Sequence, residues 1–180
     1  MTPTKAKVLD AAIELVGTEG LRALTHARVD ARAGVPRGTT SNYFRSRRAL
    51  LSGVSDRFVE RELEDAGSAL RPASAEEFVD ALCGLLGELT GPQRVQTAAR
   101  LALFVEGGHD DDVRDAVLRG RAAAEQAALV ALARLGARDP VAATAAVVTC
   151  FQGLLLRRIA RLDDSDPRPV LELVVTAALR

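Results

Sequence analysis

The side chains best suited to specific chemistry in this sequence are the guanidinium of Arg37 and the carboxamide of Asn42. Arginine can donate two hydrogen bonds to O6 and N7 of guanine, and asparagine can bond N6 and N7 of adenine in the major groove of DNA. Hydroxyl, imidazole and guanidinium groups that can bind phosphate oxygens stand nearby. They belong to Thr25, His26, Thr39, Ser41, Tyr43 and Arg47. The pattern predicts a surface that reads DNA bases and holds the DNA backbone.

Three of these side chains also have plain structural interpretations. Arg37 could be solvated on a short helix, Asn42 could bond its own backbone at a helix end, and Tyr43 could pack against Phe44. Arg48 is expected to lie on an ordinary solvated face. These alternatives stay open at the level of sequence.

The sequence offers little for catalysis or metal binding. Its two histidines, His26 and His109, lie far apart in the chain. The run from His109 to Asp112 has metal-ligand residue types, but consecutive side chains at a helix start point in different directions, so a helix cap is the expected role. Cys83 and Cys150 lie in apolar segments and are expected to be inert thiols. We therefore expect no enzyme activity, metal or cofactor.

The elements that must position the DNA-reading groups are predicted to be helices, in an all-α fold with about nine of them. The expected ranges are 4–17, 25–33, 36–44, 47–70, 75–90, 93–106, 110–135, 141–162 and 167–180. The second and third form a helix-turn-helix. Gly34 supplies the positive φ of the turn, and Pro36 suits the first turn of the next helix. The second helix of such a motif enters the major groove.

Charge is divided unevenly along the chain, although its 180 residues have a net charge of zero. Residues 1–57 contain ten Lys and Arg against five Asp and Glu, so this part carries +5 and the remainder −5. A basic head on an acidic body favours a polyanionic partner at one end. Two widely separated cysteines and the lack of a signal pattern favour a reducing cytoplasm. No apolar run approaches the ~18 residues that span a membrane.

Residues 5–51 resemble the DNA-binding head of the TetR family of bacterial regulators. The family outline is a helix ending in Gly, then T-x-x-x-[hydrophobic]-A-x-x-A-G-V-S, a G-x-L-Y-x-H-F-like recognition helix, and K-x-x-L-L. The matching residues are Gly20, Thr25, Val29, Ala33, Gly34, Val35, Gly38, Phe44, Leu50 and Leu51, with Arg47 where the family usually has lysine.

The sequence departs from that outline at five positions. Asp30 replaces the usual alanine, Pro36 the serine cap, Thr40 the leucine, Ser41 the tyrosine and Tyr43 the histidine. Thr40 is expected to face inward, in place of a core leucine.

The resemblance implies a helix-turn-helix DNA-binding domain over residues 1–50 and a helical ligand-binding and dimerisation domain over residues 51–180. Gly38 joins the expected DNA-binding residues because it matches the family pattern. Residues 111–135 and 139–162 are long, Ala-rich and apolar over a wide face, as an interface between two subunits requires. The second of these helices is apolar on most sides and is therefore expected to be buried.

A small-molecule pocket in the body is likewise implied by the resemblance. Apolar walls with few polar groups suit a hydrophobic ligand. The candidate lining residues are Phe78, Leu82, Cys83, Leu86, Phe104 and Phe151, each of which could equally be plain core.

Together these features predict a ligand-responsive transcriptional regulator. We expect a homodimeric repressor that binds double-stranded operator DNA and is released by a small hydrophobic molecule, with no membrane partner. The alternative is a small-molecule-binding helical protein whose head recognises DNA weakly or not at all, which the departures at Asp30 and Ser41 motivate. A helical enzyme or structural module is the remaining option, and the lack of a catalytic constellation argues against it.

Overall fold

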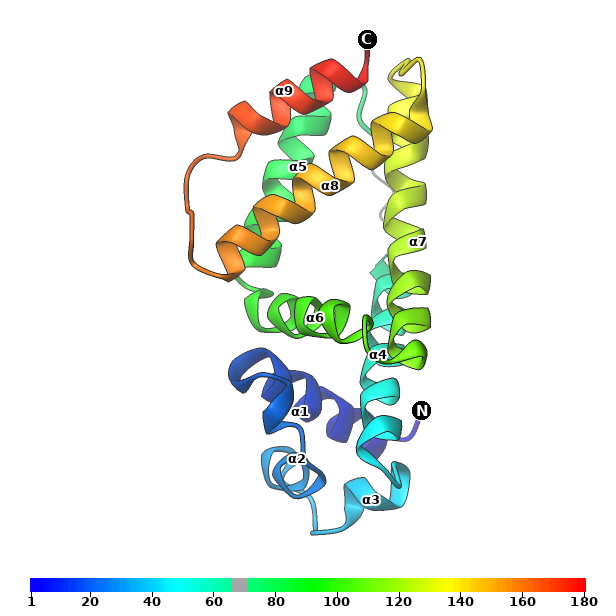
Figure 1. Cartoon of the computed structure of the whole chain (residues 1–180), viewed down its shortest axis with the longest axis vertical. Helices are drawn as coiled ribbons and strands as arrows, with labels where there is room; N and C mark the ends of the chain where they lie inside the picture. Colours follow the sequence, from blue (N-terminus) through cyan, green and yellow to red (C-terminus); the bar gives the residue numbers. More distant parts are fainter. Residues whose placement is uncertain (66–70) are drawn as a thin grey trace. The chain divides into compact units, whose positions relative to one another are not determined.

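The computed structural model describes the backbone of residues 1–65 and 71–180, and the side chains of residues 1–60, 71–122 and 124–180. Within these ranges the chain forms nine α-helices, one short 3-10 helix and no strand (Figure 1). They are α1 (Pro3–Glu19), η1 (Leu21–Ala23), α2 (His26–Ala33), α3 (Thr39–Tyr43), α4 (Arg47–Asp65), α5 (Ala75–Thr90), α6 (Arg94–Glu106), α7 (Asp111–Arg134), α8 (Pro140–Ile159) and α9 (Arg168–Ala178). The all-α prediction is confirmed. The predicted continuation of α4 over 66–70 lies outside the described residues.

The helices form two compact units. The head unit consists of Met1–Glu64 and Val95–Gly120, and the body unit of Asp65–Arg94 and Arg121–Arg180. Most of α6 and the first part of α7 therefore belong to the head unit. The expected boundary after residue 50 falls within α4.

Apolar residues that recur with the helical period on one face of α1 form the centre of the head unit's core. The helix buries Val8, Leu9, Ala11, Ala12, Ile13, Leu15 and Val16. They pack with Val29 and Ala33 of α2, with Phe44, and with Leu50, Leu51 and Val54 of α4. Ala99, Leu103 and Val113 complete the same cluster from α6 and α7. One apolar core thus supports both helices of the helix-turn-helix.

The start of α1 differs from the sequence prediction, which used Thr4 as the cap, whereas its end lies within the predicted span from Gly17 to Gly20. Thr2, not Thr4, caps its start, since the Thr2 hydroxyl accepts a hydrogen bond from the N–H of Lys5. Gly17 lies inside the helix, at a point where α1 approaches α6 closely. A Cβ atom on Gly17 would stand 2.1 Å from the carbonyl oxygen of Val95. Gly20 ends the helix with a φ of 81°.

The body unit has a separate apolar core formed where α5, α8 and α9 pack together with α7 (Figure 1). Its buried residues are Phe78, Val79, Leu82, Ala131, Leu132, Ala143, Val147, Leu171 and Val175. Cys83 and Cys150 are half-buried against this core and form no disulfide. Burial raises the pKa of both thiols, so they stay protonated near neutral pH.

The expectation that no apolar run approaches the length of a membrane span is corrected by α8. Its length of 20 residues and mean hydropathy of 1.4 meet the test for a membrane span by length and composition alone, which the core helix of a soluble protein also passes. Only 22% of that apolar window is buried within the chain, so the predicted burial of α8 against a second subunit stays a prediction. Val141 and Leu156 are 70% and 53% exposed. The helix therefore keeps an apolar face that the described residues do not cover.

Candidate nucleic-acid interface

The predicted helix-turn-helix is formed by α2, the turn after it, and α3. Gly34 ends α2 in the left-handed conformation, with φ 61° and ψ 41°. The N–H of Val35 then donates to the carbonyl of Asp30 at 3.1 Å, which closes the helix end. The expected role of Gly34 is confirmed, because a residue with a Cβ atom adopts this conformation only at a cost.

The second helix is shorter than predicted. It begins at Thr39, whereas the sequence favoured a start at Pro36 or Arg37. Gly38 has a φ of 90°, so it cannot continue a right-handed helix. The carbonyl of Pro36 accepts hydrogen bonds from the Thr39 N–H at 3.1 Å and the Thr39 hydroxyl at 2.6 Å. Arg37 therefore stands in a turn that leads into α3.

Asp30, which the sequence marked only as a departure, caps α3 from α2. Its side chain is 2% exposed. One carboxylate oxygen accepts from the N–H and hydroxyl of Thr40 at 2.8 and 2.5 Å, and the other accepts from the N–H of Gly38 at 2.7 Å. Burial raises the pKa of Asp30, but the hydrogen bonds from Thr40 and Gly38 outweigh it, so the pKa is lowered. Thr40 is fully buried, as expected.

A signal for this role was present in the sequence. A carboxylate next to Val29, on the apolar side of a short helix, needs buried donors. The turn before α3, within ten residues of Asp30, supplies such donors. The first N–H groups of any helix have no hydrogen-bond partner within that helix.

The predicted DNA-binding residues fall into two groups. Arg37, Gly38, Ser41, Asn42 and Tyr43 are exposed, and all lie on α3 or the turn before it. The structure brings these five together on one short segment. Whether they touch DNA stays a prediction.

The other four predicted DNA-binding residues make contacts inside the head unit. Thr25 caps α2 by accepting from the N–H of Arg28, and Thr39 bonds the carbonyl of Pro36. A guanidinium nitrogen of Arg47 donates to the carbonyl of Leu21 at 2.9 Å. The Nε2 atom of His26 lies 2.7 Å from the carbonyl oxygen of Phe44, and since a carbonyl only accepts, Nε2 is the donor. These contacts position the motif whether or not the same side chains also reach phosphates.

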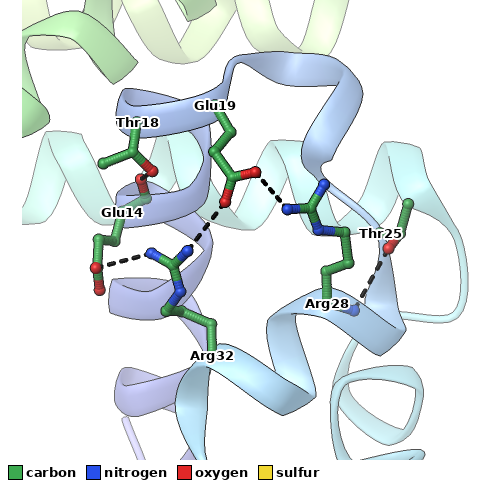
Figure 2. A network of polar contacts seen from close by, with 6 residues as sticks. All are labelled: Glu14, Thr18, Glu19, Thr25, Arg28 and Arg32. Atoms are coloured by element: carbon green, nitrogen blue, oxygen red, sulfur yellow. Dashed lines mark hydrogen bonds and ion pairs between the residues drawn. The ribbon is translucent and has the colours of Figure 1, made fainter.

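A network of ion pairs fixes α2 on the end of α1 (Figure 2). Arg32 lies between Glu14 and Glu19, at 2.8 and 3.0 Å, while Arg28 pairs with the other carboxylate oxygen of Glu19. Arg37 and Arg45, by contrast, lie in no ion pair with any described residue. Arg37 and Arg45, which flank α3, therefore carry positive charge that no described side chain neutralises.

The N-terminal residues also contact residues 37–44, which we call the reading segment, and the sequence did not predict these contacts. The ammonium group of Lys5 lies 5.5 Å from the centre of the Phe44 ring, and the hydroxyls of Thr2 and Tyr43 are 3.5 Å apart. The only signal was the position of Lys5, near one end of an amphipathic helix.

Arg48 and the three aspartates at the start of α7 have structural roles in the head unit. Arg48, expected to be merely solvated, pairs with Asp112 at 2.9 Å and Asp110 at 3.5 Å. Asp110 caps α7 by accepting from the N–H groups of Asp112 and Val113, as predicted. Among the described residues, no group of three or more His, Cys, Asp or Glu side chains could hold a metal ion.

The predicted pocket residues do not share one unit. Phe78, Leu82 and Leu86 of α5 are buried, and Cys83 and Phe151 are half-buried, all in the body unit. Phe104 belongs to the head unit and is 46% exposed. The structure therefore groups five of the six candidates by unit and separates the last.

Two family models match the chain. One, described as bacterial regulatory proteins of the tetR family, matches residues 8–54. The other, described as the tetracyclin repressor-like C-terminal domain, matches residues 73–180. The second match alone covers more than half of the chain.

Comparisons with individual proteins agree with the family models. The chain is 31% identical to the HTH-type transcriptional regulator BetI of Cronobacter sakazakii over 108 residues, which is 59% of this chain and 44% of that protein. It is 30% identical to BetI of Rhizobium meliloti over 118 residues, 63% of this chain and 57% of that protein. The chain thus spans about half the length of the curated relatives it matches.

Solved structures share the fold over nearly the whole chain. A transcriptional regulator from Rhodococcus sp. Rha1 superposes with a TM-score of 0.82 at 15% identity, covering 97% of this chain and 95% of that one. The multidrug binding protein EbrR complexed with proflavin gives a TM-score of 0.64 at 22% identity, covering 97% and 99%. The chain belongs to the TetR family of bacterial transcriptional regulators, which are DNA-binding proteins and not enzymes.

Proposed function

We propose that the protein is a cytoplasmic, ligand-responsive repressor that binds operator DNA through α3 and the turn before it. The observation that carries this proposal is the exposed group of Arg37, Ser41, Asn42 and Tyr43, beside arginines that lie in no ion pair. Arg37 and Asn42 are suited to guanine and adenine edges. The hydroxyls of Ser41 and Tyr43 are suited to phosphate oxygens, which fix the register of the complex.

The first test is binding of the purified protein to fluorescent DNA from upstream of its own gene, at several salt and competitor concentrations. We expect binding that resists competitor DNA and weakens steeply with salt. Arg37→Ala should cost ~1–3 kcal/mol and relax discrimination between sequences. Arg138→Ala, which removes an exposed arginine of the body unit, is the matched control. Equal effects of the two variants would contradict the proposed base contact.

We further propose that the protein works as a homodimer formed through α8 and α9. These helices pack against each other, and both expose apolar side chains, among them Val141, Leu156, Val170 and Leu173. Ala142, Ala145, Thr149 and Gly153 on the exposed side of α8 are small enough to allow close helix approach. A dimer would present two reading segments to half-sites ~34–36 Å apart. Sedimentation of the purified protein at several concentrations tests this, and a monomer at every concentration would contradict it.

The effector is proposed to be a small hydrophobic molecule. EbrR, which shares the fold, is a multidrug binding protein complexed with proflavin, and the body unit offers Phe78, Leu82, Leu86 and Phe151 as apolar candidates for a pocket wall. A ligand releases DNA only by binding the released form more tightly, and a tenfold shift requires about 1.4 kcal/mol of differential binding. We propose that α4, which follows the reading segment directly, carries the change.

Proflavin is a suitable first probe because its fluorescence reports binding. Proflavin that binds the protein and lowers its affinity for the upstream DNA would support the switch. Proflavin that binds while the DNA affinity stays unchanged would contradict it.

The alternative, a ligand-binding protein whose head no longer reads DNA, rested on Asp30 and Ser41. The hydrogen bonds of Asp30 to the start of α3 remove the first argument. The exposure of Ser41 leaves that position able to reach DNA, although with a smaller side chain than the tyrosine of the family outline.

A further inference from the structure

We propose that Asp30 is a positioning residue for sequence recognition: its carboxylate, supplied from α2, fixes the backbone from which Arg37, Ser41 and Asn42 project. The proposal rests on the DNA-reading role proposed above for α3. Under this proposal, a buried side chain that does not contact DNA affects which DNA sequence the protein binds.

The reading segment needs such support because α3 is short. It spans only Thr39–Tyr43, and isolated helices of this length do not form in water. Its N-cap residue is Gly38, which has no side chain to satisfy the first N–H groups. Buried N–H groups without partners are costly. A cap from elsewhere in the fold is therefore required.

Asp30 meets that requirement with both of its oxygens. One accepts from the N–H of Gly38, and the other from both the N–H and the hydroxyl of Thr40. The three bonds join residues on both sides of the first helical position. They also satisfy the hydroxyl of Thr40, which is fully buried. Because the carboxylate is ionised, each bond is stronger than one between neutral groups.

The opposite end of α3 is held by the same helix. His26 and Asp30 stand four residues apart, so their side chains share a face of α2. His26 donates from Nε2 to the carbonyl of Phe44, the residue that ends α3. α2 therefore forms hydrogen bonds with both ends of α3. The ion pairs of Figure 2 in turn fix α2 to α1. Of the two side chains, Asp30 is the one that binds the end of α3 nearest Arg37.

The effect on DNA binding should be selective. Base contacts depend on placement within a fraction of an ångström, whereas phosphate contacts by exposed arginines tolerate displacement and carry no sequence information. Loss of the Asp30 cap should therefore reduce discrimination between operator and competitor DNA far more than it reduces binding to competitor DNA alone.

The first experiment needs no DNA. Amide hydrogen exchange of the full chain is compared between wild type, Asp30→Ala and Ser74→Ala, where Ser74 is the N-cap of α5 and its hydroxyl accepts from the N–H of Glu77. We expect Asp30→Ala to speed exchange of residues 38–44 by about tenfold or more, the scale of losing an N-cap. Ser74→Ala should speed exchange only near α5. Unchanged exchange at 38–44 in Asp30→Ala would overturn the proposal.

The second experiment uses the same variants and Arg37→Ala. It measures the ratio of the affinity for the upstream DNA to the affinity for competitor DNA. Asp30→Ala should lower this ratio by about tenfold, while competitor binding stays within about twofold. Asp30→Asn keeps the shape and one acceptor oxygen but turns an NH₂ group toward a donor, so it should fall between wild type and Asp30→Ala. It also serves if Asp30→Ala fails to fold.

The two proposals fail in different ways. Wild-type protein that shows no discrimination at all would contradict the DNA-reading role of α3. Wild-type discrimination that is lost in Arg37→Ala but fully kept in folded Asp30→Asn and Asp30→Ala would overturn the positioning role alone.

Discussion

The helix-turn-helix region and the α8–α9 region differ in how many of their large apolar side chains are exposed. Among the described side chains of residues 1–60, only Met1 and Tyr43 are large, apolar and exposed. α8 and α9 expose Val141, Leu156, Val170 and Leu173. A surface that meets a polyanion works with polar groups over a closed core, whereas an uncovered apolar face needs a second apolar surface. The difference indicates that the α8–α9 region, and not the helix-turn-helix region, presents the apolar face suited to a second subunit.

The largest effect that tests this comparison is expected from two leucines of α9. Leu171 is fully buried and Leu173 is 71% exposed, although they stand two residues apart. Leu171→Ala should lower the free energy of unfolding by about 2–5 kcal/mol. Leu173→Ala should change it by less than about 0.5 kcal/mol in a monomer.

Urea unfolding measures both variants, and sedimentation at several concentrations measures dimer dissociation. We expect Leu173→Ala to raise the dissociation constant of the dimer. An unchanged constant would remove this part of α9 from the proposed interface.

The closed core of the head unit can be tested at Gly17. Alanine favours helix over glycine, but a Cβ atom here would meet the backbone oxygen of Val95 at 2.1 Å. We therefore expect Gly17→Ala to destabilise the protein by about 1–3 kcal/mol, as overpacking does. Gly84→Ala in α5 is the control, because a Cβ atom there meets nothing within 4 Å. Thermal unfolding compares the two, and equal stability would mean that α1 and α6 are not packed so closely.

The polar side of the comparison predicts a pH dependence at Asp30. Its pKa in the folded protein is lowered, chiefly by the hydrogen bonds from Thr40 that outweigh burial. A lowered pKa stabilises the fold above the unfolded value of about 3.9, and the stabilisation is lost as the pH falls through the folded pKa. The stability difference between wild type and Asp30→Asn should be constant from about pH 5 to 7 and narrow below about pH 4.

Urea unfolding across this range measures the difference. Ser74→Ala, which changes no titratable group, should differ from wild type by the same amount throughout. A gap for Asp30→Asn that is equally constant at low pH would contradict the ionised cap.

The smallest effect is expected at Arg48. Its pairs with Asp110 and Asp112 are solvent-exposed, with the Arg48 side chain 62% exposed. Arg48→Ala should cost no more than ~0.2–1 kcal/mol, and less at high salt. A loss above 2 kcal/mol at high salt, measured by urea unfolding, would show that this pair holds the head unit together more than its exposure suggests.

Local patterns in the sequence were sufficient to predict much of the fold and the exposed positions of the candidate DNA-binding residues on α3. The 3.6-residue period located the core face of α1, Gly34 located the turn, and Arg37 and Asn42 were placed on the exposed reading segment. These features depend on residues close together in the chain.

Features that depend on distant residues were not predicted. The partner of Asp30 lies ten residues away across a turn, and the reason for Gly17 lies at Val95, on another helix. For α8 the sequence predicted an interface between subunits but not how little of the helix is buried within its own chain, because an apolar helix looks the same in sequence whether its own chain or a partner covers it.

The cap from α2 has a consequence for how this protein can change over generations. Asp30 and His26 hold α3 at its ends, so the helix does not depend on Ser41 and Asn42. The side chains of Ser41 and Asn42 have no partner within the described chain. Exposed positions without such duties accept substitution with little change in stability. A descendant can therefore acquire a new operator preference at these two positions while inheriting the same fold intact.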